Sequence, residues 1–215
     1  MKKTVLTLVG CMAALIMLAS NGQFEKAMGE NIPAMFQARD AQSLQSVINK
    51  LNRIGEAEKG KWEPHYYVAF GYIRMMAFAE SAEDKDKYLD QALVAIEKGE
   101  SVKPNDSELE SLRGYVHMMR VTIDPPSRGM QYSGMAFTSF NKAIAIDPNN
   151  ARAHFLLGRM QYGTAQFMGN GDGGACESFQ KAKEILESKG QNSNPFAPTW
   201  GMGQTKEAIE QMCNG

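Results

Sequence analysis

The sequence is poor in the residues that most reactive sites require. Its 215 residues include three cysteines, three histidines and two tryptophans, and neither charge dominates, because the formal net charge is −1. Near-neutral charge leaves no basic surface that would indicate nucleic-acid binding. The chain has no GxSxG, HExxH or P-loop motif, and no cysteine–histidine pair at a recognisable spacing. We therefore expect no enzyme, no metal site and no cofactor.

Long apolar runs are also missing, apart from one at the N-terminus. A lysine pair precedes an apolar run over residues 5–19, and the small residues Ser20 and Gly22 follow it. This three-part pattern is typical of a secretory signal peptide, and the run is shorter than the roughly 20 residues of a membrane span. We expect residues 1–22 to be a cleaved signal and the rest to be exported, most simply to the periplasm, with no transmembrane segment.

Cys11 indicates an alternative to simple cleavage of the signal. The residues Leu-Val-Gly-Cys ending at Cys11 spell a lipobox, which would make this cysteine a lipid anchor. Only about six mainly apolar residues precede Cys11, fewer than a signal core usually has, and an equally apolar stretch follows. The pattern favours simple cleavage, with a lipoprotein or a secreted protein as the alternatives.

Removal of Cys11 with the signal would leave two cysteines, Cys176 and Cys213. An even pair in an oxidising compartment is typical of a disulfide, which would tie the C-terminal tail to the body of the protein. Two free, half-buried thiols are the alternative. Neither cysteine has the spacing of a zinc ligand.

A repeat of 43–44 residues runs through the centre of the chain. Two segments repeat the same anchors 44 residues apart, namely Ala92, Ile96, Gly99 and Pro104, then Ala136, Phe140, Ala143 and Pro148. A third copy, displaced by 39, has Ala175, Phe179 and Ala182. Small residues at positions i and i+7, with a large one at i+4, lie on one helix face and let a neighbouring helix approach closely. Each copy therefore predicts one helix, which a proline ends in the first two.

Glycines mark the segments that precede these helices. Gly71, Gly114 and Gly158 recur at intervals of 43 and 44 residues, so each unit consists of two helices. We expect an all-α, right-handed solenoid of helical hairpins in one domain over residues 23–215. Its expected parts are an N-terminal helix pair at 24–57, repeats at about 63–101, 107–146 and 151–189, and a capping tail at 195–213.

These marks resemble the tetratricopeptide repeat, which has Gly in its first helix, Ala-aromatic-Ala in its second, and a closing Pro. The standard unit has about 34 residues, and the surplus here falls at the turn between the two helices. With these inserts and their flanks included, residues 24–213 resemble the exported tetratricopeptide-type proteins common in Bacteroidota. The resemblance implies a helical repeat protein, mostly of unassigned function, and brings no catalytic residues.

In such arrays the first helices line a concave face, which is the expected binding surface. Its candidate residues are Tyr72, Tyr115 and Arg159, each next to a repeat glycine, with Tyr162, Phe155, Arg152 and His65 on the same side. Tyr and Arg combine apolar area with hydrogen bonding, which suits recognition. Packing between helices is the alternative role for each of them.

The inserts should project from one edge of the array, where Arg128 and Tyr132 are candidate rim residues or loop scaffolding. The glycine-rich insert at 169–174 predicts a tight turn with positive φ. The function expected from all these features is non-catalytic: a protein-binding or scaffold module of the cell envelope with a protein partner. The alternative is a periplasmic solute-binding or transporter-accessory component that holds a small ligand in the concave groove.

Overall fold

The computed structural model describes residues 22–188 and 194–213, and no strand occurs among them. The predicted signal, including Cys11, lies outside the described residues apart from Gly22. No helix in the described ranges combines the length and the apolar character needed to cross a membrane. The helices are 22–37, α2 (Ala41–Ala57), α3 (Glu63–Met75), the 3-10 helix η1 (Met76–Phe78), α4 (Ala82–Val102), α5 (Ser107–Ile123), α6 (Pro125–Ile146), α7 (Ala151–Met168), α8 (Ala175–Ser188) and α9 (Met202–Cys213).

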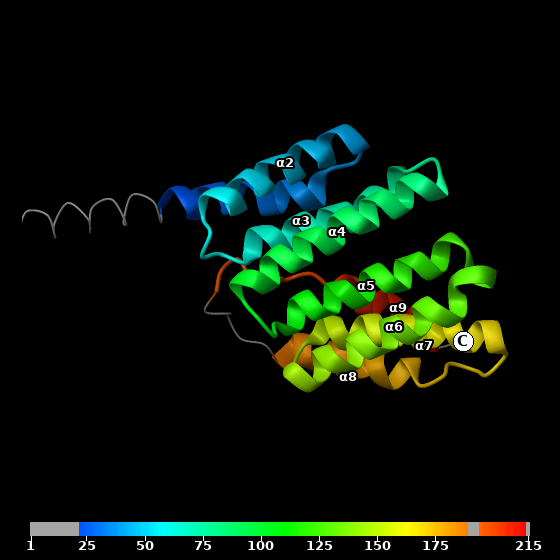
Figure 1. Ribbon diagram of the computed structural model, residues 1–215. Helices are drawn as coiled ribbons and strands as arrows, with labels where there is room; N and C mark the ends of the chain where they lie inside the picture. The colour runs from blue at the N-terminus through cyan, green and yellow to red at the C-terminus, as the bar shows by residue number, and fades with distance from the viewer. Residues whose placement is uncertain (1–21, 189–193, 214–215) are drawn as a thin grey trace, which may run out of the picture.

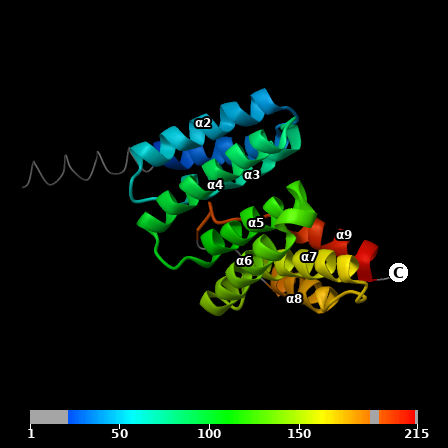
Figure 2. The same cartoon turned by 45° about the vertical axis from the view of Figure 1, so that its right-hand side comes forward.

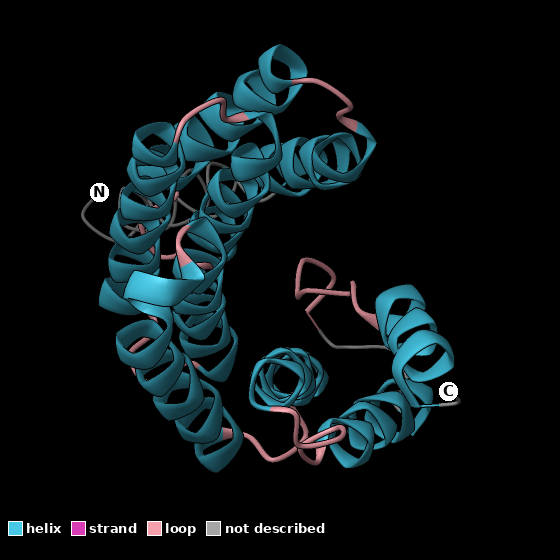
Figure 3. Ribbon diagram, turned by 90° about the vertical axis from the view of Figure 1, so that its right-hand side faces the viewer, coloured by secondary structure: helices cyan, strands magenta, loops and turns pink. Residues whose placement is uncertain are grey.

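Successive helices pack as antiparallel hairpins that stack in chain order (Figure 1). The first helices α3, α5 and α7 contact one another in turn, whereas the second helices α4, α6 and α8 contact mainly their own partners. Because the first helices approach more closely than the second ones, the stack curves into an arc with α3, α5 and α7 on its inner side (Figure 3). The predicted all-α solenoid is confirmed, and α9 returns to pack on α8 and α7 (Figure 2).

Side-chain caps fix where the first helices begin. Asp106 accepts hydrogen bonds from the N–H groups of Glu108 and Leu109 at the start of α5, and Asn150 accepts one from Ala153 at the start of α7. Both caps follow a proline by two residues, so the proline ends one helix and the cap begins the next. The two caps are 44 residues apart, which fixes the stacking period.

Two of the repeat glycines allow close helix packing. A Cβ added at Gly114 would lie 2.5 Å from the Phe140 ring, and one added at Gly158 would lie 2.6 Å from the Phe179 ring. In both hairpins the glycine therefore faces the large residue of the second helix. Gly71 differs, because a Cβ there would meet Ile48 and Met35 of the preceding helix pair.

The inserts, residues 80–87, 122–134 and 164–174, lie at one end of the array, as expected (Figure 1). Most of their residues are helical rather than looped. They lengthen α4 to 21 residues and α6 to 22. Pro125 is tolerated inside the second insert because it occupies the first turn of α6, where its missing N–H is not needed. Only the insert at 169–174 forms an irregular turn, in which four glycines adopt positive φ.

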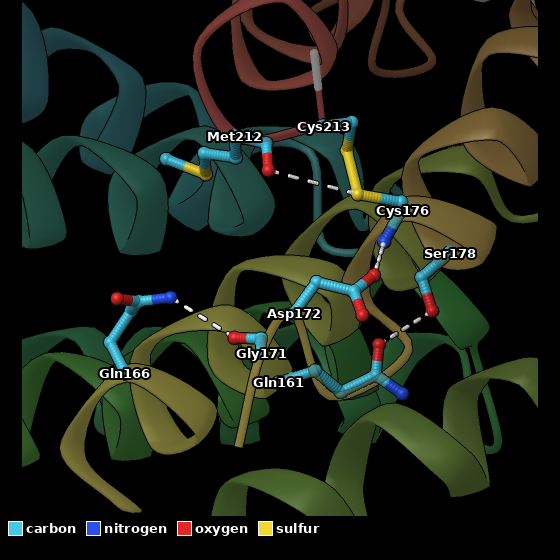
Figure 4. The surroundings of a disulfide bond; sticks show 8 residues. All are labelled: Gln161, Gln166, Gly171, Asp172, Cys176, Ser178, Met212 and Cys213. Carbon is cyan, nitrogen blue, oxygen red and sulfur yellow. Dashed lines mark hydrogen bonds between the residues drawn. A yellow bond between two sulfur atoms is a disulfide. The ribbon is translucent and has the colours of Figure 1, made fainter. Parts of the chain in front are cut away.

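A disulfide joins Cys176 at the start of α8 to Cys213 at the end of α9, with the Cα atoms 5.7 Å apart. This bond confirms the predicted pairing over the alternative of free thiols. The turn beside it is held by hydrogen bonds, because Asp172 accepts from the Cys176 N–H and Gln166 donates to the Gly171 carbonyl (Figure 4). The tail is therefore fixed to the insert end of the last repeat.

Candidate functional site

The inner side of the arc carries two different surfaces. The surface at the N-terminal ends of α3 and α7 is covered by residues 194–201, which we call the strap. The surface at their C-terminal ends is not contacted by the strap in any described hydrogen bond or ring contact. The strap therefore occupies one of the two surfaces and leaves the other uncovered.

Trp200 anchors the strap. Its ring stacks on Phe70 with the ring centres 5.2 Å apart and meets Phe155 edge-on at 6.5 Å. The indole N–H donates to the Tyr66 hydroxyl at 2.8 Å. Elsewhere in the strap, Asn194 donates to the Glu63 carboxylate at 2.7 Å, the Phe196 ring meets Phe24 edge-on at 5.3 Å, and the Tyr67 hydroxyl makes a long contact of 3.5 Å with the Ala197 carbonyl. We call the surface of Tyr66, Tyr67, Phe70 and Phe155 beneath the strap the trough.

Arg152 also serves the strap, so it does not offer a free charge to a ligand. It is 3 % exposed, forms a two-pronged ion pair with Glu108 and donates to the Trp200 carbonyl at 3.1 Å. Burial acts to lower the pKa of Arg152, but the neighbouring Glu108 carboxylate outweighs it and the pKa is raised, so the guanidinium stays charged. Arg152 and Phe155 therefore belong to the covered surface.

The uncovered surface is formed by Arg74, Tyr115, Arg159 and Tyr162, and we call it the Tyr–Arg face. Arg159 and Tyr162 lie seven residues after Arg152 and Phe155, which places them two turns further along the same side of α7. Tyr115 is half-buried on α5, and the charges of Arg159 and Arg74 both act on its hydroxyl. This face therefore joins three successive first helices, α3 near its C-terminal end and α5 and α7 near their middles.

The Tyr–Arg face is cationic. The Arg74 guanidinium donates to the Met35 carbonyl and, at 3.5 Å, to the Ala38 carbonyl, which holds it in place without neutralising it. Burial and the nearby charge of Arg39 lower the pKa of Arg74. Neither Arg39 nor Arg159 forms an ion pair with any residue in the described ranges. Burial raises the pKa of Tyr115, so this phenol is a neutral hydrogen-bond donor.

Two of the predicted concave residues lie elsewhere. Tyr72 is two residues beyond Phe70, about 200° around the helix, and so points away from the inner side that Phe70 shares with Arg74. Tyr72 therefore does not occupy the place on α3 that Tyr115 occupies on α5. The reason is that Gly71 faces the preceding helix pair instead of its own partner helix. His65 is 5 % exposed and packs against Gly55 of α2 and Gly99 of α4.

The predicted rim residues hold the insert end together. Arg128 of α6 donates two hydrogen bonds of 2.8 Å to Asp86 of α4. The Tyr132 ring is stacked on His117 at 6.2 Å, with the Arg120 guanidinium 5.6 Å away. Arg128 thus joins the α5–α6 hairpin to α4, whereas Tyr132 packs within its own hairpin, so both act as scaffolding.

Exposed apolar side chains mark the same end of the molecule. Met130 is 96 % exposed on α6, and Phe167 and Met168 are 81 % and 64 % exposed at the end of α7. The exposure of these three residues was not predicted from the sequence, although the run Gln-Phe-Met-Gly places Phe167 and Met168 directly before a glycine turn. A large apolar side chain at such a site has no core to enter.

The histidines are separated. His65 and His117 are buried in different helices, and the His154 ring nitrogen contacts the Pro148 carbonyl. In the part of the chain that the structure describes, no three residues of the metal-ligating types are grouped closely enough to hold an ion. The Tyr–Arg face itself contains no histidine.

Comparison with solved structures supports the fold. The HusA haemophore from Porphyromonas gingivalis superposes with a TM-score of 0.77 at 22 % sequence identity, over 89 % of this chain and 94 % of that one. A tetratricopeptide-repeat protein from Thermus thermophilus gives a TM-score of 0.53 at 18 % identity, over 81 % and 89 %. The predicted likeness to tetratricopeptide-type proteins of Bacteroidota is confirmed at the level of the fold. No protein-family model matches the sequence, and neither does any curated protein.

Proposed function

We propose that this protein is a non-catalytic carrier that binds haem or a related planar, anionic tetrapyrrole on its Tyr–Arg face. The observation that carries the proposal is the grouping of Arg74, Tyr115 and Arg159 from three successive repeats, with no acidic partner for Arg159 among the residues that the structure describes. An aromatic ring offers stacking area, and an unpaired guanidinium can form a two-pronged contact with a carboxylate. Haem presents both a flat apolar ring and two carboxylates.

Two further features support a small ligand over a peptide in the concave groove. The strap already fills the half of the groove that has the largest apolar side chains. The solved structure with a TM-score of 0.77 is that of a haemophore, and it covers nearly the whole of both chains. With no histidine on the face, this chain would hold the ring and the carboxylates by stacking, hydrogen bonds and charge.

Export is part of the same proposal. The N-terminal pattern of a basic pair, an apolar run and small residues predicts a signal, and the Cys176–Cys213 disulfide suits an oxidising compartment. A carrier of this kind would act in the periplasm or beyond it. Mass spectrometry of the mature protein would distinguish a cleaved exported protein from a lipoprotein, because cleavage before Gln23 and lipidation at Cys11 give different N-termini.

The test of ligand binding is a titration with haem, followed by absorbance, for the wild type and for Arg159→Gln. We expect the variant to bind about tenfold more weakly, because it loses a charged contact to a ligand carboxylate. Arg53→Gln is the matched control, since Arg53 is exposed on the outer side of α2 and the change in charge is the same. Equal weakening by both variants, or no saturable binding by the wild type, would contradict the proposal.

Docking of a protein partner is the second candidate function, and the exposed apolar residues at the insert end favour it. Met130, Phe167 and Met168 offer anchors of the type found at the centres of interfaces. If Phe167→Ser abolishes capture of a stoichiometric partner from envelope extracts and leaves haem affinity unchanged, the two functions use separate surfaces.

A further inference from the structure

The tail after α8 is attached to the rest of the protein in two distinct ways. The strap makes several non-covalent contacts with the trough, whereas α9 is joined covalently through Cys213. Only Thr205 and Ala208 of α9 are fully buried. Apart from a 3.9 Å contact between Cys176 Sγ and the Met212 carbonyl, no described hydrogen bond or ion pair joins α9 to α7 or α8. Apart from the apolar contacts of Ala208, Ile209 and Met212 with the core, the disulfide is therefore the main tie of α9.

The attachment of α9 is coupled to that of the strap. Trp200 is separated from the start of α9 by one residue, Gly201, whose φ of +126° lies in a region that favours glycine. The Trp200 carbonyl accepts from Arg152, and the same residue's ring stacks on Phe70. Movement of α9 away from α8 would thus pull on the strongest anchor of the strap.

We propose that the strap and α9 form a redox-sensitive latch over the trough, held shut by the Cys176–Cys213 disulfide. The reductant is a dithiol. Its thiolate attacks one sulfur of the disulfide and displaces the other cysteine as a thiolate, its second thiol, once deprotonated, then resolves the mixed disulfide, and both cysteine thiolates take up protons from water. Two electrons pass to the protein, which leaves two cysteine thiols, and the reductant becomes a disulfide.

Opening of the latch would change the chemistry of the concave side. The rings of Tyr66, Tyr67, Phe70 and Phe155, buried in the latched state, would become accessible. Arg152 would lose the Trp200 carbonyl as an acceptor while keeping Glu108. The Tyr–Arg face lies further along the same helices and makes none of these contacts, so the inference does not depend on the ligand proposed for that face.

Hydrogen exchange measured by mass spectrometry tests the latch on the full-length protein in three states: oxidised, reduced with dithiothreitol, and carrying Cys213→Ser. We expect peptides from residues 194–213 to exchange about tenfold faster or more in the reduced protein than in the oxidised one. Peptides from α3 and α5 should be unchanged. Cys213→Ser should match the reduced wild type and should not respond to dithiothreitol.

Two outcomes would overturn the proposal. Unchanged exchange in residues 194–213 after reduction would show that the strap and α9 stay in place without the bond. Faster exchange throughout α3, α5 and α7 would show that the disulfide stabilises the whole array and does not act locally. Acrylamide quenching of Trp200 in a Trp62→Phe background gives a second measurement, and we expect quenching to increase on reduction.

Discussion

Single residues set how closely the helices of one hairpin approach. Gly114 and Gly158 each face an aromatic ring of the partner helix at a distance that leaves no room for a Cβ. The spacing of small and large residues indicated which helix faces pack, because that spacing is a local property. It did not say which neighbour each glycine faces, since that depends on the rotation of its helix, and Gly71 faces the preceding helix pair instead of its own partner helix.

Gly158→Ala tests this residue-level packing. The added Cβ would lie 2.6 Å from the Phe179 ring and 3.1 Å from the Ala175 carbonyl, so the hairpin must shift, and we expect a loss of about 1–3 kcal/mol of unfolding free energy. Gly163→Ala in the same helix is the control, because its Cβ would meet nothing within 4 Å and should gain up to about 1 kcal/mol. Urea denaturation measures both. Similar effects of the two changes would contradict the account.

The buried histidines predict sensitivity to acid. Burial, followed by the charge of Lys98, lowers the pKa of His65 below 6.5, and burial with Arg113 and Arg120 lowers that of His117. The unfolded chain therefore takes up protons first as the pH falls below about 6.5, and stability is lost from there down to the folded pKa values. We expect the urea midpoint to decrease between pH 7.5 and pH 5.5, and the double variant His65→Asn, His117→Asn to show a smaller decrease. A midpoint that is independent of pH in this range would contradict the prediction.

At the scale of elements, the repeat is longer than a standard tetratricopeptide unit because its helices are longer. The sequence indicated where the surplus residues lie but suggested loops, since charged residues and prolines are common in loops. In the structure Ser81 caps α4 and Pro125 opens α6, so the same residues begin helices. Residue type alone could not distinguish a loop from the first turn of a helix, because both favour these side chains.

Asn150→Ala tests how one element is joined to the next. Asn150 is fully buried, caps α7 and donates to Ser107 and Ser111 of α5, at 2.8 and 3.2 Å. Its removal leaves these hydroxyls without a donor as well as the helix without a cap, so we expect a loss of about 2–3 kcal/mol. Asp40→Ala removes an exposed cap of α2 and should cost less. Chemical denaturation would refute this account if both changes had equal effects.

At the scale of the whole molecule, the tail divides the concave side into a covered and an uncovered half. The sequence suggested that Cys213 would tie the tail down, and this bond is present, while Trp200 pins the tail as well. It did not predict that the strap would lie across α3 and α7. Contacts such as that of Trp200 with Tyr66 span 134 residues, and no periodic pattern in the sequence records them.

Only part of the candidate site could be predicted, because helical spacing indicates which residues share a helix face but not what covers them. Tyr115, Arg159 and Tyr162 follow from helical spacing within α5 and α7, and the structure brings Arg74 beside Tyr115. Arg152 and Phe155 share the inner side of α7 but are covered by the strap, which only the folded chain reveals. The free surface is therefore smaller than the sequence suggested, and more cationic.

Hydrogen exchange with and without haem tests the central claim most directly, because it locates the ligand on the molecule. We predict that haem slows exchange in the middle turns of α5 and α7, around Tyr115 and Arg159, while the strap and the outer helices α4 and α6 keep their rates. Protection confined to the insert end around Phe167, or no protection at any position, would contradict a ligand site on the Tyr–Arg face.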